Sequence, residues 1–80
     1  MKTPAEIKKE MGLRLKKARE DAGYLTPQEF CTKNNLPLEL YLQHENGSKG
    51  IKASNAQQYC KLLNISLDWL IIGEELFLTA

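Results

Sequence analysis

Few residues of this chain have the chemistry of a catalytic or metal-binding group. The sequence has one histidine, His44, and neither Cys31 nor Cys60 lies at a metal-ligand spacing from it. The adjacent carboxylates Glu74 and Glu75 are typical of an exposed charge run rather than of an acid and base pair. The sequence contains no Ser-His-Asp constellation, glycine-rich phosphate loop or metal-ligand cluster. We therefore expect no enzyme activity, no cofactor and no metal.

The charges of the chain are unevenly distributed. Residues 1–20 hold seven Lys or Arg and three Glu, a balance of +4, whereas residues 21–48 hold one Lys and four acids, a balance of −3. The overall charge is only +1 and the pI is near 7.7. A nucleic-acid-binding protein usually has a stronger basic character, so charge alone does not predict DNA binding.

Length and composition indicate a single domain. Eighty residues, 42% of them hydrophobic, can form one small core and leave little room for an enzyme cleft beside it. The start, Met1 to Glu10, is charged, unlike a signal segment, and the longest apolar cluster, Trp69 to Ile72, is far shorter than the roughly 20 residues of a membrane span. We expect one soluble domain over residues 1–80, in the reducing cytoplasm and without a membrane partner.

Helix start and stop signals divide the first half of the chain into two helices. Thr3 to Glu6 has the pattern of a capping box with proline at the first helical position, which predicts a helix running to about Ala22, before Gly23. The same pattern at Thr26 to Glu29 predicts a second helix. It can be only about two turns long, because Asn34-Asn35 is a turn signal.

Three further helices follow. Pro37 begins a helix that runs through Glu45, and a polar loop continues to Ser54, which we expect to cap a helix over residues 55–63. Ser66 should cap a fifth helix over residues 67–71, which Gly73 ends. The pattern predicts an all-α fold, a compact five-helix bundle in which the second and third helices form a helix-turn-helix unit.

Three stretches of the sequence, in this order and at this spacing, carry a family resemblance. They are Gly12 to Glu20, His44 to Gly50, and Ser66 to Leu70 with Gly73. The chain resembles the phage-repressor and Cro-like helix-turn-helix family, often called the XRE family, over about residues 10–74, leaving a short apolar tail at 75–80. The resemblance implies a lambda-repressor-like DNA-binding domain, encoded by a bacterium or phage and located at the nucleoid when it binds DNA.

The resemblance also implies individual roles at double-stranded DNA. The helix over residues 37–45 would enter the major groove, with Leu38, Glu39 and Gln43 at its base-reading positions. The second helix would cross the backbone with its amino-terminal end facing a phosphate. The residues expected to contact phosphates are Arg14, Thr26, Gln28, Asn46, Ser48, Lys49 and Lys52. In the same pattern Arg19 forms a structural salt bridge with Glu45.

The expected base-reading face departs from the polar composition usual in the family. It shows Leu38, Glu39 and Leu42, and Gln43 is the one standard base-reading side chain, with a bidentate contact to adenine. Leu38 and Leu42 are four residues apart and therefore share a helical face. Either one of them is partly covered by the loop after Gly47, or they form a protein-binding patch with Glu39. The alternative function is thus a helix-turn-helix scaffold used as a protein-interaction module, such as a small inhibitor or a docking subunit.

Other residues are expected in the core or at a dimer contact. His44 stands where the family usually has an aliphatic residue, so we expect a buried, hydrogen-bonded histidine. Cys31 and Cys60 are expected to be small buried hydrophobic residues without a disulfide. The fifth helix and tail of family members commonly form the dimer contact, which here assigns Trp69, Leu76 and Phe77 to a homodimer interface. The sequence indicates no small-molecule ligand.

Overall fold

Helix α1 (Pro4–Asp21) begins at the capping box that the sequence predicts. In the structure, a computed structural model that describes residues 1–73, the hydroxyl oxygen of Thr3 accepts a hydrogen bond of 3.1 Å from the backbone N–H of Glu6. The Glu6 carboxylate accepts one of 3.0 Å from the backbone N–H of Thr3, which completes the box and lowers the pKa of Glu6. The helix ends before Gly23, whose φ is +96°.

Helices α2 (Pro27–Asn34) and α3 (Leu38–Asn46) are joined by a tight turn. The turn passes through Asn35 with φ +56°, a left-handed conformation that Asn adopts more readily than most residues that are not glycine. Pro37 has extended backbone and precedes α3, so the predicted start of this helix is one residue too early. α3 ends at Asn46, one residue later than predicted, and Gly47, with φ +80°, is its cap.

Helices α4 (Ala53–Leu63) and α5 (Leu67–Ile72) complete the element order. The predicted cap of α4 at Ser54 is wrong, because the chain is already helical from Ala53 and Lys52 is the cap residue. The backbone carbonyl of Lys52 accepts from Ala56 at 2.9 Å, and this end of α4 has no side-chain cap. The predicted cap of α5 is confirmed, since the Ser66 hydroxyl accepts from the backbone N–H of Trp69 at 3.0 Å.

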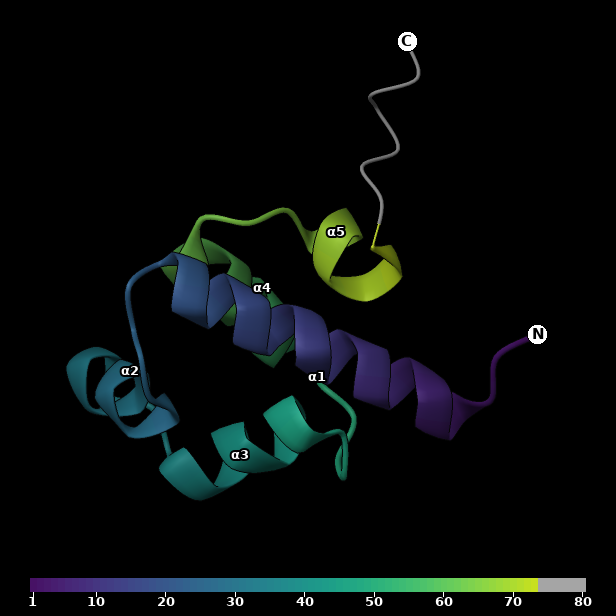
Figure 1. Ribbon diagram of the computed structural model, residues 1–80, viewed down its shortest axis with the longest axis horizontal. Coiled ribbons are helices and arrows are strands. Elements are labelled where there is room, and N and C mark those ends of the chain that lie inside the picture. Colours follow the sequence, from purple (N-terminus) through teal and green to yellow (C-terminus); the bar gives the residue numbers. More distant parts are fainter. Residues whose placement is uncertain (74–80) are drawn as a thin grey trace, which may run out of the picture.

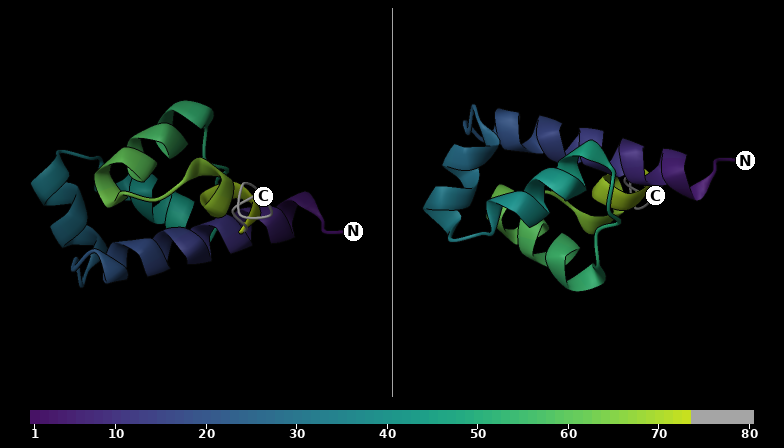
Figure 2. Two further views of the ribbon diagram at one scale, coloured as in Figure 1. Left: turned by 90° about the horizontal axis from the view of Figure 1, so that it is seen from above. Right: turned by 90° about the horizontal axis from the view of Figure 1, so that it is seen from below.

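The five helices surround one aromatic core. In Figure 1, α1 crosses the molecule between α2 and α3 on one side and α5 on the other, and Figure 2 shows its first turns extending beyond the other helices. Phe30, Tyr41 and Tyr59 are buried, with ring centroids 5.2 Å apart for the first two and 5.5 Å apart for the last two. Within residues 1–73 the structure has five helices and no strand, which confirms the all-α fold class.

Two glycines allow α1 to contact the carboxyl-terminal end of α3 closely. A Cβ atom at Gly12 would collide with the backbone carbonyl oxygen of Glu45 and lie 2.8 Å from the carbonyl oxygen of His44. A Cβ atom at Gly47 would lie 2.8 Å from the Cα of Lys9. The backbone of α1 is therefore packed directly against the end of α3.

None of the helices within residues 1–73 has the length and apolar composition needed to cross a membrane.

Candidate nucleic-acid interface

Helix α3 has one buried face and one exposed face. Tyr41 and His44 are buried against the other helices, whereas Glu39, Leu42, Gln43 and Asn46 are exposed. The exposed residues are spaced at i, i+3, i+4 and i+7, so they form one stripe along the helix. The chain therefore supports α3 from behind and leaves its outer face open to a partner.

A buried ion pair joins the supported face of α3 to α1. The Nε of Arg19 donates to one carboxylate oxygen of Glu45 at 3.1 Å, and Nη2 of Arg19 donates to the other at 3.3 Å. Nη1 of Arg19 also donates to the backbone carbonyl of Tyr24 at 2.7 Å, and the two charged side chains are only 3% and 11% exposed. The predicted Arg19–Glu45 salt bridge is confirmed, and its fixed geometry positions α3 more than it adds net stability.

A second buried contact joins α3 to α4. The Nδ1 of His44 lies 2.8 Å from the hydroxyl oxygen of Tyr59, and His44 is 1% exposed, which confirms the buried, hydrogen-bonded histidine. Burial, aided by the positive charge of Lys49, lowers the pKa of His44, so the imidazole is neutral at pH 7. Burial also raises the pKa of Tyr59 to about 12, so its hydroxyl keeps its proton.

The three predicted base-reading positions do not lie on one exposed surface. Glu39 and Gln43 are exposed on the stripe, but Leu38 is half-buried and packs against the core. The most exposed leucine of α3 is Leu42, at 40%, and the base-reading role of Leu38 stays a prediction. Leu38 lies at the start of α3, where its side chain packs against the hydrophobic core.

Leu42 borders a hollow between α1 and α3 that sequence reasoning did not identify. The hollow has a volume of about 300 Å³ and is lined by Leu13, Lys16, Leu42, Glu45 and Asn46. Leu13, on α1, is 62% exposed. The outer surface of α3 thus continues onto α1 through Leu42 and Leu13, with Lys16 beside them.

The end of α3 and the loop that follows it hold four of the predicted phosphate-contacting residues. Asn46, Ser48, Lys49 and Lys52 are all exposed. The side-chain oxygen of Asn46 accepts a 2.8 Å hydrogen bond from the backbone N–H of Ser48, which shapes the start of the loop. This loop presents two lysines next to the carboxyl-terminal end of α3.

The amino-terminal end of α2 is only partly available to an anion. Thr26 and Gln28 are exposed, as the phosphate-contacting role requires. However, the Thr26 hydroxyl oxygen accepts from the backbone N–H of Glu29 at 3.1 Å, and the Glu29 carboxylate accepts from that of Leu25 at 3.1 Å. The chain itself uses these two N–H groups, which leaves the backbone N–H and the side chain of Gln28 to meet a phosphate here.

Arg14 has a structural role that the sequence does not predict. Its Nε donates to the backbone carbonyl of Leu70 at 2.8 Å, and its Nη2 donates to that of Ile71 at 2.8 Å. The guanidinium thus satisfies carbonyl groups at the carboxyl-terminal end of α5, where the helix dipole favours a cation. These bonds make Arg14 a structural cap of α5, and its predicted phosphate contact stays a prediction.

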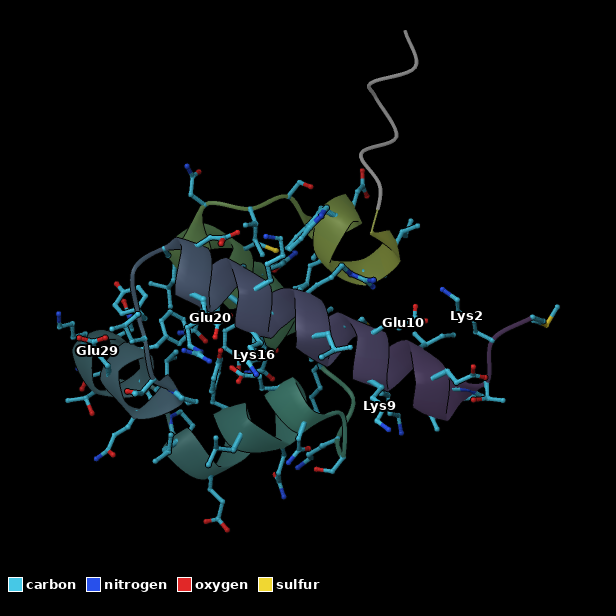
Figure 3. The ribbon with its side chains drawn as sticks, viewed as in Figure 1. Lys2, Lys9, Glu10, Lys16, Glu20 and Glu29 are labelled. Atoms are coloured by element: carbon cyan, nitrogen blue, oxygen red, sulfur yellow. The ribbon has the colours of Figure 1, made fainter. Side chains whose placement is uncertain are left out.

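Many of the basic side chains gather near the end of α3. Within residues 1–73, ion pairs engage Lys2 with Glu10, Lys17 with Asp21, and Lys33 with Glu29. No ion pair within the same residues involves Lys8, Lys9, Lys16, Lys49, Lys52 or Lys61. Figure 3 shows Lys9 on the side of α1 that faces the loop after α3, and the Lys2–Glu10 pair on the other side. The sequence shows that residues 1–20 are basic but does not indicate that they lie beside the end of α3.

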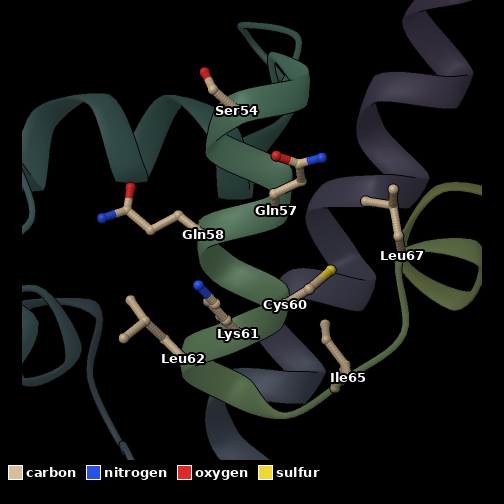
Figure 4. A pocket seen from close by; sticks show the side chains of 8 residues that line it. All are labelled: Ser54, Gln57, Gln58, Cys60, Lys61, Leu62, Ile65 and Leu67. Carbon is tan, nitrogen blue, oxygen red and sulfur yellow. The ribbon is translucent and has the colours of Figure 1, made fainter.

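The surface formed by α4 and α5 also carries exposed apolar residues. A groove of about 820 Å³ runs along α4, and its lining includes Cys60, Lys61, Leu62 and Leu67 (Figure 4). Four exposed apolar residues lie on these two helices: Leu62, Leu67, Ile71 and Ile72. Trp69, predicted at a dimer interface, is half-buried and packs against the core, and Leu76 and Phe77 lie outside the described residues.

The two thiols are not joined. Cys31 and Cys60 are free, with Cys31 buried and Cys60 half-buried. Burial raises the pKa of both thiols, as expected for small hydrophobic residues that take part in packing.

Comparisons of the chain with family models, with curated proteins and with solved structures find no match.

Proposed function

We propose that this chain is a cytoplasmic, sequence-specific DNA-binding regulator of transcription that inserts α3 into the major groove of double-stranded DNA. The observation that carries the proposal is the exposed stripe of α3, which the Arg19–Glu45 and His44–Tyr59 contacts hold in place from behind. Rigid support of this kind is what a base-reading helix requires, because its side chains must meet base edges at fixed positions.

The side chains of the stripe can form a small set of base contacts. Gln43 can bond to the N6 and N7 atoms of adenine, Glu39 can accept from N4 of cytosine, and Leu42 can contact a thymine methyl group. Asn46 and Lys49 follow at the end of α3, where the phosphate backbone borders the groove. The proposed surface therefore has two parts: α3, which contacts base edges, and the following loop, which contacts phosphates.

A homodimer on a palindromic operator completes the proposal. The exposed apolar residues of α4 and α5 provide the contact surface between two copies. Two copies of α3 would then enter successive major grooves on one side of the duplex, roughly 34 Å apart.

Selection from a pool of random duplexes tests the proposal. The bound fraction should become enriched in an inverted repeat, and retention of all sequences alike would contradict it. Gln43→Ala should cost about 1 to 3 kcal/mol at one base pair, whereas Lys49→Gln should weaken binding to all sequences equally. Lys17→Gln, which changes an exposed lysine of α1 that pairs with Asp21, is the matched control for the charge loss and should leave both properties unchanged.

The second candidate function is a protein-interaction module, and the hollow between α1 and α3 favours it. For this function we propose Leu13 with Leu42 as the contact in place of Leu38 with Leu42, because Leu38 packs against the core. The double variant Leu13→Ser, Leu42→Ser separates the two functions. A protein partner would be lost, whereas the phosphate-driven affinity for DNA would persist.

A further inference from the structure

We infer that the first half of α1 extends the DNA phosphate-binding surface, with Lys8 and Lys9 as additional contacts to the backbone beside the loop after α3. This inference rests on the proposed function. It adds a segment that the base-reading helix and its loop do not include.

Backbone packing places the two lysines at this loop. The Cα of Lys9 lies 2.8 Å from the position of a Cβ at Gly47, and the Cε of Lys8 lies 3.5 Å from that at Gly50. Gly47 and Gly50 flank Lys49, so the charges of α1 and of the loop occupy the same region. The position of Lys9 follows from its own backbone atoms, which touch the loop, and so does not depend on the rotamer of its side chain.

The carboxylates nearest in sequence have other partners. The Glu6 carboxylate accepts from the backbone N–H of Thr3, and Glu10 pairs with Lys2 at 2.7 Å. Figure 3 shows Glu10 on the side of α1 away from Lys9. Within residues 1–73, no ion pair neutralises Lys8 or Lys9, so their charges are available to an external anion.

The surroundings of these lysines favour a phosphate backbone over a protein partner. Stable protein interfaces are centred on buried apolar or aromatic side chains. The loop here presents Gly47, Ser48 and Gly50, which have no such side chain. A duplex instead offers a continuous row of negative charges, and each neutralised phosphate releases counterions.

The salt dependence of binding tests the inference. Affinity for a fluorescein-labelled duplex is measured by anisotropy over a range of KCl concentrations, for the wild-type chain and for the double variant Lys8→Gln, Lys9→Gln. Loss of two phosphate contacts in each subunit should reduce the slope of log K against log salt by about 1.8 per bound subunit, or about 3.6 for the proposed dimer, since each contact contributes about 0.9. The variant Lys8→Arg, Lys9→Arg should keep the wild-type slope.

A matched control removes two charges elsewhere. The double variant Lys2→Gln, Lys17→Gln has the same net charge but changes two exposed lysines that pair with Glu10 and Asp21, and its slope should stay near the wild-type value. Equal slopes for the two glutamine variants would overturn the inference while leaving DNA binding intact. A wild-type chain that binds no duplex even at low salt would overturn the proposed function itself, and the inference with it.

Phosphate-ethylation interference supplies a readout that a general loss of charge would not produce. Ethylation of the phosphates that Lys8 and Lys9 contact, which lie beyond those contacted by α3 and its loop, should interfere with binding of the wild-type chain. This interference should disappear in the Lys8→Gln, Lys9→Gln variant and remain in the control. The same pattern for both variants would contradict direct contact. Circular dichroism should be the same for all these chains, because both lysines are exposed and glutamine has a similar helix propensity.

Discussion

Replacing Gly12 by alanine should weaken the contact between α1 and α3 on which the presentation of α3 depends. The new Cβ would collide with the Glu45 carbonyl oxygen and lie 2.8 Å from the Glu45 carbonyl carbon, so neither a rotamer change nor a small side-chain movement relieves it. The two helices must separate, and the Arg19–Glu45 pair that joins them must lengthen.

The size of the effect follows from two opposing terms. Overpacking a close contact costs about 1 to 3 kcal/mol, and the upper value applies here because the atoms in contact belong to the backbone. Alanine regains about 1 kcal/mol over glycine inside a helix. The net loss is about 2 kcal/mol, which lowers the Tm of a domain of this size by roughly 8 to 16 °C.

Thermal and urea unfolding of Gly12→Ala and Gly50→Ala test this reasoning as a pair. At Gly50 the nearest atom to a new Cβ is a flexible lysine carbon at 3.5 Å, an ordinary contact, so the stability should change by no more than about 0.5 kcal/mol. A Gly12→Ala chain as stable as the Gly50→Ala chain would show that the helices do not pack at this distance.

His44, the two thiols and Arg14 provide further tests. Because burial keeps the pKa of His44 below its usual 6.5, the unfolded chain binds more protons in this range, and the free energy of unfolding should fall as the pH drops below about 6.5. The free energy of unfolding of His44→Leu, measured with urea, should not fall in this pH range. Parallel pH profiles for the variant and the wild-type chain would contradict the lowered pKa of His44. A thiol reagent should label Cys60 in the native chain and Cys31 only after unfolding, whereas equal labelling rates would contradict the burial of Cys31. Arg14→Met removes two hydrogen bonds to α5 and should lower the free energy of unfolding by about 1 kcal/mol, without changing the salt slope of DNA binding. A reduced slope would instead support a phosphate contact.

Features set by neighbouring residues could be predicted from the sequence. The caps at Thr3, Thr26 and Ser66 and the left-handed turn at Asn35 depend on hydrogen bonds and backbone preferences within a few residues. The start of α4 was missed because Lys52 is a cap without a side-chain bond, which leaves no signal in the sequence.

Parts of the candidate interface depend on packing between distant segments and could not be predicted from local patterns. Arg14 is separated by more than fifty residues from the carbonyl groups that it caps, so its spacing in α1 gave no indication of them. Leu38 and Leu42 share a helical face by spacing, but the core lies to one side of that face and covers Leu38 more. The approach of Lys9 to the loop follows from Gly12 and Gly47, whose importance becomes visible only when the helices are placed together.

The central claim is that the outer face of α3 meets DNA, and an NMR titration tests it most directly. Amide chemical shifts of the ¹⁵N-labelled chain are followed while the selected duplex is added. We expect the largest changes along the exposed stripe of α3, from Glu39 to Asn46, and in the loop that carries Lys49. Changes confined to α4 and α5, or no changes at low salt, would contradict the claim.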